Sequence, residues 1–553
     1  MSVGALPLLD LAPELIHACL SFLPLDDIAS CLHAGSRLLT TLILDSPAIR
    51  YRIEQEEAGV EENPYSSALA GLDISARLAE LRARERRWRE FDPVSRHKID
   101  YPTWPVLLYT IHAGLWIAAQ EMQDTGPGGS ALADAVRYVD MSPQAQPAEW
   151  RTVFSGTPFA NFATALEEHD LLVIFTVVVC PDEPSMVSID ALMLTFSTGS
   201  PHAMASLPKV HITRRAANNP ISDLNAEVSG DMIALAIYNE NNMYADTNYL
   251  YVLNWKTGTI LLGPTVITSI GLAFLSPRDL LIASASKNCL FVYSFSDSST
   301  SLVPTIIRLW LPQVRPRTGI VGPQMQCRRS PNPHNHLSHP RYHAARFPPA
   351  PNCANIFLSY ETIDVDSDEC ETHPYLMVPE YILDAVKLAR EDEIDDPKPE
   401  VEIDWEMWGE RCTRWLWPQD VAGAWILASS GHRMVAYPPF NPQAPRRGPK
   451  QMQILDFNPR GVAALRSQLK NGERVSDTMR LVLRNTLPVS QKETAGFTHY
   501  AQRVRSRLPY IEMTAPEEYK FDNVYLSEEF IIGRTYGEEE KGIVESLEVL
   551  YFG

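Results

Sequence analysis

The feature that most constrains the fold is a pair of β-strands that recurs along the chain. Each copy has a continuous apolar run, typical of a strand buried on both faces, and then an alternating strand that ends in or near an aromatic residue. The copies lie at 170–196, 231–255, 279–295, 424–437 and 529–552. A buried strand followed by a more exposed one is the repeating element of a β-propeller blade.

The repeat predicts one large all-β domain at 100–553, a β-propeller of about six to eight blades, with a pair of two-sheet sandwiches as the alternative. It looks like a divergent WD-repeat propeller, although no blade starts with Gly-His or ends with Trp-Asp. Closure of the ring requires the last strand, 547–552, to pair near the start of the domain, and 115–118 is the expected partner.

Two insertions interrupt the predicted strands. Residues 312–351 are rich in proline, arginine and histidine, which predicts a long irregular loop. Residues 391–406 are strongly acidic, which predicts an exposed excursion.

The N-terminal part of the chain has helical spacing instead. Residues 10–59 predict four short helices, with Asp10, Asp26 or Asp27, and Ser46 as N-terminal caps, and glycines at 35 and 59 as ends. Apolar residues cover more than one face of each helix. Because about fifty residues cannot bury that much apolar surface internally, part of it should face the rest of the chain or a partner.

Residues 8–52 resemble an F-box, the module that tethers substrate receptors to the Skp adaptor of cullin-based ubiquitin ligases. The matching runs are 11–16, 20–28, 36–38, 42–43 and 45–47, and the continuation to Gly59 is similar to fungal, mushroom-type F-box proteins. The chain departs from the family at Ala12, where proline is usual, and at Leu38 or Leu39, where an aromatic residue is usual. The late tryptophan of the family is also absent. The resemblance implies a helical module at 5–59 whose adaptor-binding residues are Pro13, Leu15, Ile16, Leu20, Leu23, Leu25, Ile28 and Leu38.

A connector at 60–92 follows, with a predicted amphipathic helix from Ala76 to Phe91. Glu80 and Glu85 stand four residues before Arg84 and Arg89, a spacing that favours local ion pairs on a solvated face. We expect this helix to brace the helical module against the β domain.

Composition narrows the possible partners and compartment. The net charge of −20 disfavours nucleic acid, because phosphate would be repelled. The eight scattered cysteines contain no CxxC pair and indicate free thiols of a reducing compartment. No secretory signal or membrane-length apolar run is visible. These features predict a cytoplasmic or nuclear protein that does not enter a membrane.

The sequence gives no positive reason to expect catalysis or a cofactor. Motifs for serine hydrolases, zinc proteases, phosphate loops and dinucleotide sites are absent. Acidic residues at 364–369 lack the glycine and the terminal glutamate of a calcium loop. One group has the right types for zinc but matches no zinc spacing and is interpreted as exposed loop residues: Cys327, His334, His336, His339 and His343.

The function that these features predict is that of a substrate receptor of a cullin-type ubiquitin ligase. The helices would bind the Skp-type adaptor, and through it the cullin, while the propeller recruits a protein target that the sequence does not identify. The alternative is a non-catalytic propeller scaffold without ligase function. A propeller enzyme is a third and weaker possibility, since propellers can assemble sites from distant loops.

Overall fold

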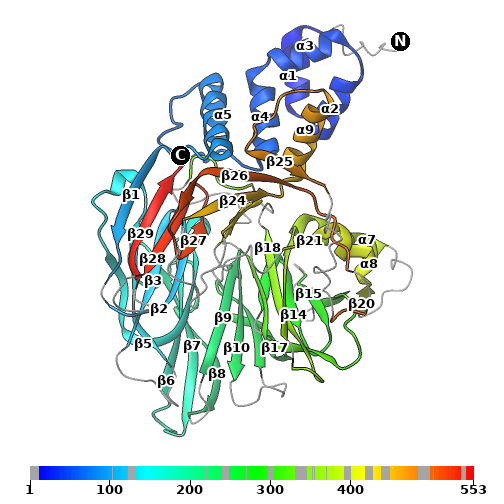
Figure 1. Ribbon diagram of the computed structural model, residues 1–553. Coiled ribbons are helices and arrows are strands. Elements are labelled where there is room, and N and C mark those ends of the chain that lie inside the picture. The colour runs from blue at the N-terminus through cyan, green and yellow to red at the C-terminus, as the bar shows by residue number, and fades with distance from the viewer. Residues whose placement is uncertain are drawn as a thin grey trace, which may run out of the picture.

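The computed structural model describes most of the chain from residue 11 to residue 553 (Figure 1). The residues outside this description are 1–10, 103, 123–130, 218–220, 240–247, 270, 297–303, 330–344, 351–352, 354, 369, 392–399, 417–427, 438–448, 484–498, 502–503 and 537–543.

Four short helices form the N-terminal part of the described chain: α1 (Pro13–Ser21), α2 (Leu25–His33), α3 (Arg37–Asp45) and α4 (Pro47–Ala58). Ser46 caps α4 as predicted, and Gly59 ends it in the left-handed conformation with φ of 67°. Neither Asp26 nor Asp27 caps α2, since the helix begins one residue after Pro24 and holds both aspartates in its first turn. Their negative charges in the first turn interact favourably with the helix dipole instead. Asp10 lies outside the described residues.

The strands that follow form six sheets, and the longest sheet contains two repeating units. Its order is β2-β3-β4-β5-β6-β7-β8. The long strand β5 (Arg151–Ala165) serves both units, because its first half pairs with β4 and its second half with β6. The other strands are β2 (Val106–His112), β3 (Leu115–Glu121), β4 (Ala133–Asp140), β6 (Leu171–Val179), β7 (Met186–Thr195) and β8 (Lys209–Ala216).

Four further units follow in chain order, each an antiparallel meander. The first two are β9 (Ile221–Ser229), β10 (Met232–Asn239), β11 (Asn248–Asn254), β12 (Thr259–Ile267), and β13 (Leu272–Ser276), β14 (Asp279–Ser284), β15 (Cys289–Ser294), β16 (Thr305–Trp310). The next two are β17 (Thr318–Arg329), β18 (Ile356–Asp364), β19 (Cys370–Met377), β21 (Thr413–Trp415), and β22 (Ser429–Ser430), β23 (Arg433–Ala436), β24 (Lys450–Asp456), β26 (Tyr510–Tyr519). Two short strands add to the edges of these sheets, β20 (Glu400–Ile403) and β25 (Met479–Val482).

The last unit closes the ring by joining the two ends of the domain. It contains β27 (Asn523–Leu526), β28 (Phe530–Tyr536), β29 (Val544–Tyr551) and, as its fourth strand, β1 (Ser95–Asp100). Pairing runs antiparallel from Ser95 opposite Tyr551 to Asp100 opposite Ser546. The first strands of successive units also lie beside one another, β5 against β9, β9 against β13, β13 against β17, and β22 against β27. Seven four-stranded units with this closure form a β-propeller.

Two details of the predicted repeat are wrong. Residues 115–118 belong to β3, which pairs with β2 and β4, so closure uses β1 instead. The fourth copy is also shifted by one strand, since Met434 lies in the second strand β23. In the other copies the apolar runs are the second strands of their four-stranded units, as in β6, β10, β14 and β28. They are buried because neighbouring blades pack on both of their faces. Burial alone is therefore a poor guide to how far a strand lies from the central axis of the propeller.

The irregular loop predicted at 312–351 contains strand β17 at the edge of its sheet. Pro323 falls within a register shift between Val321 and Gln326, where a proline does not interrupt the ladder. The segment 391–406 is not entirely an exposed excursion either. Strand β20 runs parallel to β16, and Val401, Ile403 and Trp405 are buried. The alternation of acidic and apolar residues there is a strand signal that net charge obscured.

Among the described residues, five further α-helices lie on or between the blades: α5 (Ile74–Glu90), α6 (Leu166–His169), α7 (Pro379–Glu391), α8 (Trp405–Cys412) and α9 (Pro459–Lys470). In Figure 1, α1–α4 stand at one end of the β domain beside α9, and α5 lies next to them above β26. Within the described part of the chain, no helix has the length and hydropathy needed to cross a membrane.

Candidate functional site

The first candidate site is an exposed apolar stripe along α1. Leu15 is 55% exposed and Phe22, directly after the helix, is 88% exposed. Ala18 and Cys19 lie between them and are exposed too. Positions separated by three, four and seven residues share one face of a helix. A run of apolar side chains on one open face is typical of a protein-interaction surface.

The eight residues predicted to bind the adaptor divide into two groups. Pro13, Leu15 and Leu38 are exposed and Leu23 is half-buried. The other four, Ile16, Leu20, Leu25 and Ile28, pack together inside the module with residues of α3 and α4. These four therefore hold the helices together and position the exposed residues. Phe22 was not among the predicted residues, although its spacing of seven from Leu15 is the signal that places it on the stripe.

The turn that carries Phe22 is held by α4. Arg52 donates from Nη1 to the carbonyl oxygen of Ser21 at 2.6 Å and from Nη2 to that of Leu23 at 3.0 Å. These bonds satisfy carbonyl groups at the end of α1 that have no partner within the helix. The stripe is consequently presented on a fixed turn.

The module is attached to the β domain through α4 and the residues after it. Asn458 donates from Nδ2 to the carbonyl oxygen of Glu57 at 2.8 Å, and Arg460 forms an ion pair with Glu56 at 2.5 Å. Directly after the helix, Val60 pairs with Pro349 in an isolated β-bridge. Backbone and side-chain bonds thus join the module to two separate segments of the β domain.

Helix α5 braces this junction, as its position in the sequence predicts, but its charges pair differently. Trp88 stacks on Phe552 with ring centroids 4.1 Å apart. Glu85 pairs with Arg84 at 2.5 Å and with Arg433, and Arg433 also pairs with Asp456 at 3.2 Å. The expected local ion pairs of Glu80 with Arg84 and of Glu85 with Arg89 are wrong, because Glu80 pairs with Arg346, and Glu85 and Arg84 are buried against the propeller.

Burial and charge act in opposite directions on Glu85. Burial raises the pKa of its carboxyl, but the positive charges of Arg433 and Arg84 outweigh burial, so that the pKa lies below its usual value. The carboxyl therefore stays charged in a site that is almost closed to water. A small cavity of about 20 Å³ beside Trp88 and Arg433 has room for a water molecule but not for an organic ligand.

A surface group of serine, aspartate and histidine does not have the geometry of a catalytic triad. Ser188 Oγ lies 3.0 Å from Nδ1 of His211, and Asp190 Oδ1 lies 2.8 Å from the same nitrogen. In a catalytic triad the aspartate and the serine contact different nitrogens of the histidine ring, so that the aspartate orients the ring while the serine gives its proton to it. This group therefore gives no nucleophile.

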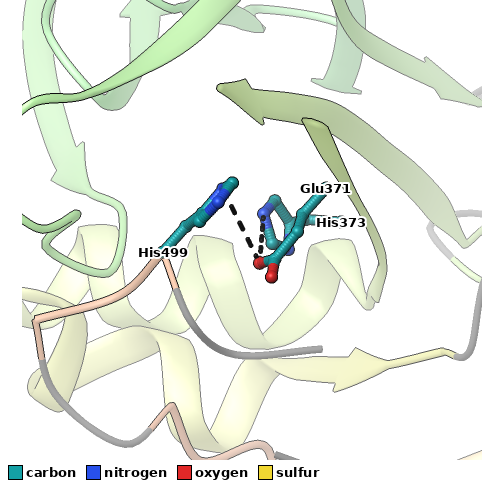
Figure 2. Close-up of side chains that lie close together, drawn as sticks. All are labelled: Glu371, His373 and His499. Carbon is teal, nitrogen blue, oxygen red and sulfur yellow. Dashed lines mark ion pairs between the residues drawn. The ribbon is translucent and has the colours of Figure 1, made fainter. Parts of the chain in front are cut away.

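The second candidate site is a buried polar cluster in the sheet that contains β18 and β19, formed by Glu371, His373 and His499 (Figure 2). Burial first, and then the charge of His499, lower the pKa of His373 to about 3, so its ring is neutral at pH 7. None of these residues was predicted from the sequence. The loop group that was weighed for zinc lies outside the described residues, except for the backbone of Cys327.

No protein-family model matches the sequence, and no curated protein matches it either. Among solved structures, the WD40 domain of SCAP from fission yeast is similar over 83% of this chain and 95% of its own, with 8% identity and a TM-score of 0.31. The GH93 α-L-arabinofuranosidase of Fusarium graminearum is similar over 83% and 98%, with 8% identity and a TM-score of 0.31. Similarity at this level assigns no family and no activity.

Proposed function

We propose that this protein is a substrate receptor of a cullin-type ubiquitin ligase, in which the helical module binds a Skp-type adaptor and the propeller recruits a protein target. The observation that carries the proposal is the open apolar stripe of Leu15 and Phe22 on a module fixed to a propeller. Interfaces draw most of their energy from a few apolar or aromatic anchors of this kind. The F-box resemblance of residues 8–52 supports a Skp-type adaptor as the partner.

The fixed junction supports the proposal in a second way. A receptor must hold its target at a defined position relative to the rest of the ligase, because ubiquitin transfer is favoured when the reacting groups are held close together. The bonds of α4 and α5 to the propeller supply such a rigid connection. In this proposal the chain is not itself an enzyme, needs no cofactor, and acts in the cytoplasm or nucleus.

The test is co-purification with a Skp-type adaptor. Leu15→Asp combined with Phe22→Asp places two charges on the stripe, and each lost anchor costs about 2 kcal/mol or more, so adaptor binding should fall by about a thousandfold. A matched control changes Val178 and Val179 to aspartate, since both are also exposed apolar residues but lie on the propeller. The control should bind normally.

A scaffold without ligase function is the other candidate, and Ala12 motivates it. Ala12 stands at the N-terminal cap of α1, makes no side-chain bond there, and replaces a proline that the F-box family usually has. If the unaltered chain forms no stoichiometric complex with any Skp-type adaptor, the ligase proposal fails and the scaffold function takes its place.

A further inference from the structure

The buried cluster of Figure 2 is assembled from two parts of the chain that are far apart in sequence. Glu371 and His373 alternate along β19, so their side chains lie on the same face of the sheet. Thr362 of β18 stands directly opposite Glu371 in the register. His499 comes from a segment 137 residues after Thr362, and its carbonyl oxygen accepts a hydrogen bond from the backbone of Arg315.

The side-chain atoms converge on one small volume. One ligand atom from each of Glu371, His373 and His499 lies within 4.8 Å of the others. Glu371 Oε2 is 3.9 Å from His373 Nε2 and 3.7 Å from His499 Nδ1. In a tetrahedral zinc site with bonds of about 2.1 Å, neighbouring ligand atoms stand about 3.4 Å apart. Shifts of a few tenths of an ångström would bring the carboxylate into that geometry.

The hydroxyl of Thr362 marks the centre of the cluster. Its Oγ1 lies 2.6 Å from His373 Nε2 and 2.8 Å from His499 Nδ1. A hydroxyl has one proton, so it can donate to only one of the two rings, and the other ring must donate to it. Both nitrogens face this oxygen at hydrogen-bond distance, so an ion held between the rings would displace the hydroxyl outward by about 0.7 Å to ligand spacing, or a water would take the fourth position.

The cluster is buried and has aromatic rings around it. His373 and His499 are almost completely buried, and Glu371 is only slightly exposed at its side chain. The rings of Tyr360, Tyr500 and Trp415 lie around His373 with centroids about 5 Å from it. Two imidazoles and a carboxylate carry a net charge of −1 when both rings are neutral, and such a set is completed by a divalent cation that accepts nitrogen and oxygen ligands.

We propose that His373 Nε2, His499 Nδ1 and the carboxylate of Glu371 bind one Zn²⁺, with the fourth position filled by the Thr362 hydroxyl or a water. The ion would fasten the segment of His499 to strands β18 and β19, and so act on the stability of this blade. The site is separate from the α1 stripe, and the proposal does not depend on adaptor binding.

The test measures zinc in the full chain. Protein purified without chelator should hold about one zinc per chain, and removal of the zinc with a chelator should lower its melting temperature. Returning Zn²⁺ should restore it, because a ligand that binds only the folded state stabilises that state. His499→Gln and Glu371→Gln should each weaken zinc binding by at least about a hundredfold in competition with a chromophoric chelator.

A matched control is His112, which is also buried and lies 3.0 Å from a threonine hydroxyl, that of Thr164. Among the described residues, His112 belongs to no group of three histidine, cysteine or acidic side chains close enough to share a metal ion. His112→Gln should therefore keep full zinc binding. The proposal is overturned if the unaltered protein holds less than a tenth of an equivalent of zinc and neither chelator nor Zn²⁺ changes its melting temperature. This holds whatever the variants do. Iron in place of zinc would overturn the assignment of the ion.

Discussion

Replacing Arg433 with methionine is expected to lower the free energy of unfolding by about 3–5 kcal/mol, the usual cost of removing one partner from a buried ion pair. Arg433 lies between Glu85 of the brace helix and Asp456 of the propeller, and all three side chains are mostly buried. Without the guanidinium, Asp456 loses its ion-pair partner in a poorly solvated site, and Glu85 keeps only Arg84. Equilibrium unfolding in urea, followed by tryptophan fluorescence, measures the loss.

Two controls separate the buried charge from the general effect of losing an arginine. Arg433→Met combined with Asp456→Asn removes a charge of each sign, leaves the pair of Glu85 with Arg84 in place, and should recover part of the stability. Arg480→Met breaks a pair with Glu512 in which the arginine is 69% exposed, and it should cost less than about 1 kcal/mol. If Arg433→Met and Arg480→Met cost the same, the brace does not depend on its buried charges.

The fold could be predicted from the sequence wherever local pattern and burial agree. Strand pairs such as β10 with β11 and β14 with β15 follow from their apolar runs and from the turns between them. The order of strands within a blade could not, because β6 and β10 are buried on both faces although neither is innermost. Ring closure by Ser95–Asp100 was missed because a strand of mixed polarity before the repeats has no pattern that links it to residue 551.

The candidate sites show the same division. Leu15 and Phe22 could be found because helical spacing is local. The pairs Glu85 with Arg433 and Glu371 with His499 could not, because each joins residues more than a hundred positions apart. The charges on α5 were also misinterpreted for a physical reason: glutamate and arginine four residues apart suit a solvated helix face, whereas here packing against the propeller supplies stronger partners.

The carboxyl group of Glu167 is buried beside two other acidic residues, and no positive charge in the described part of the chain offsets their effect on its pKa. Glu167 of α6 is 2% exposed, and its Oε1 has no hydrogen-bond partner among the described residues. Burial first, and then the charges of Glu528 and Glu168, raise the pKa of Glu167 to about 8. The group is therefore mostly protonated in the folded protein at pH 7, whereas in the unfolded chain it ionises near pH 4.5.

The sign of the pH dependence follows from these two values. The folded state keeps a proton that the unfolded state releases, so the stability contributed by Glu167 is complete below about pH 4.5 and is lost as pH rises toward 8. Across that window the free energy of unfolding should fall by up to about 1.4 kcal/mol per pH unit from this group. Glu167→Gln removes the titration, since the amide stays neutral, and the variant should gain stability relative to the unaltered protein as pH rises.

Urea unfolding at pH 5.5, 7.0 and 8.5 measures the difference. The two proteins should be closest at pH 5.5, and the variant should be the more stable at pH 8.5, because only the unaltered protein must then either hold a proton against the pH or bury a charge. Glu183→Gln, at an exposed position, should leave the pH dependence of the unaltered protein unchanged. Parallel stability curves for Glu167→Gln and the unaltered chain would mean that water or a positive group reaches this carboxyl in the folded protein, and that its burial does not control the response to pH.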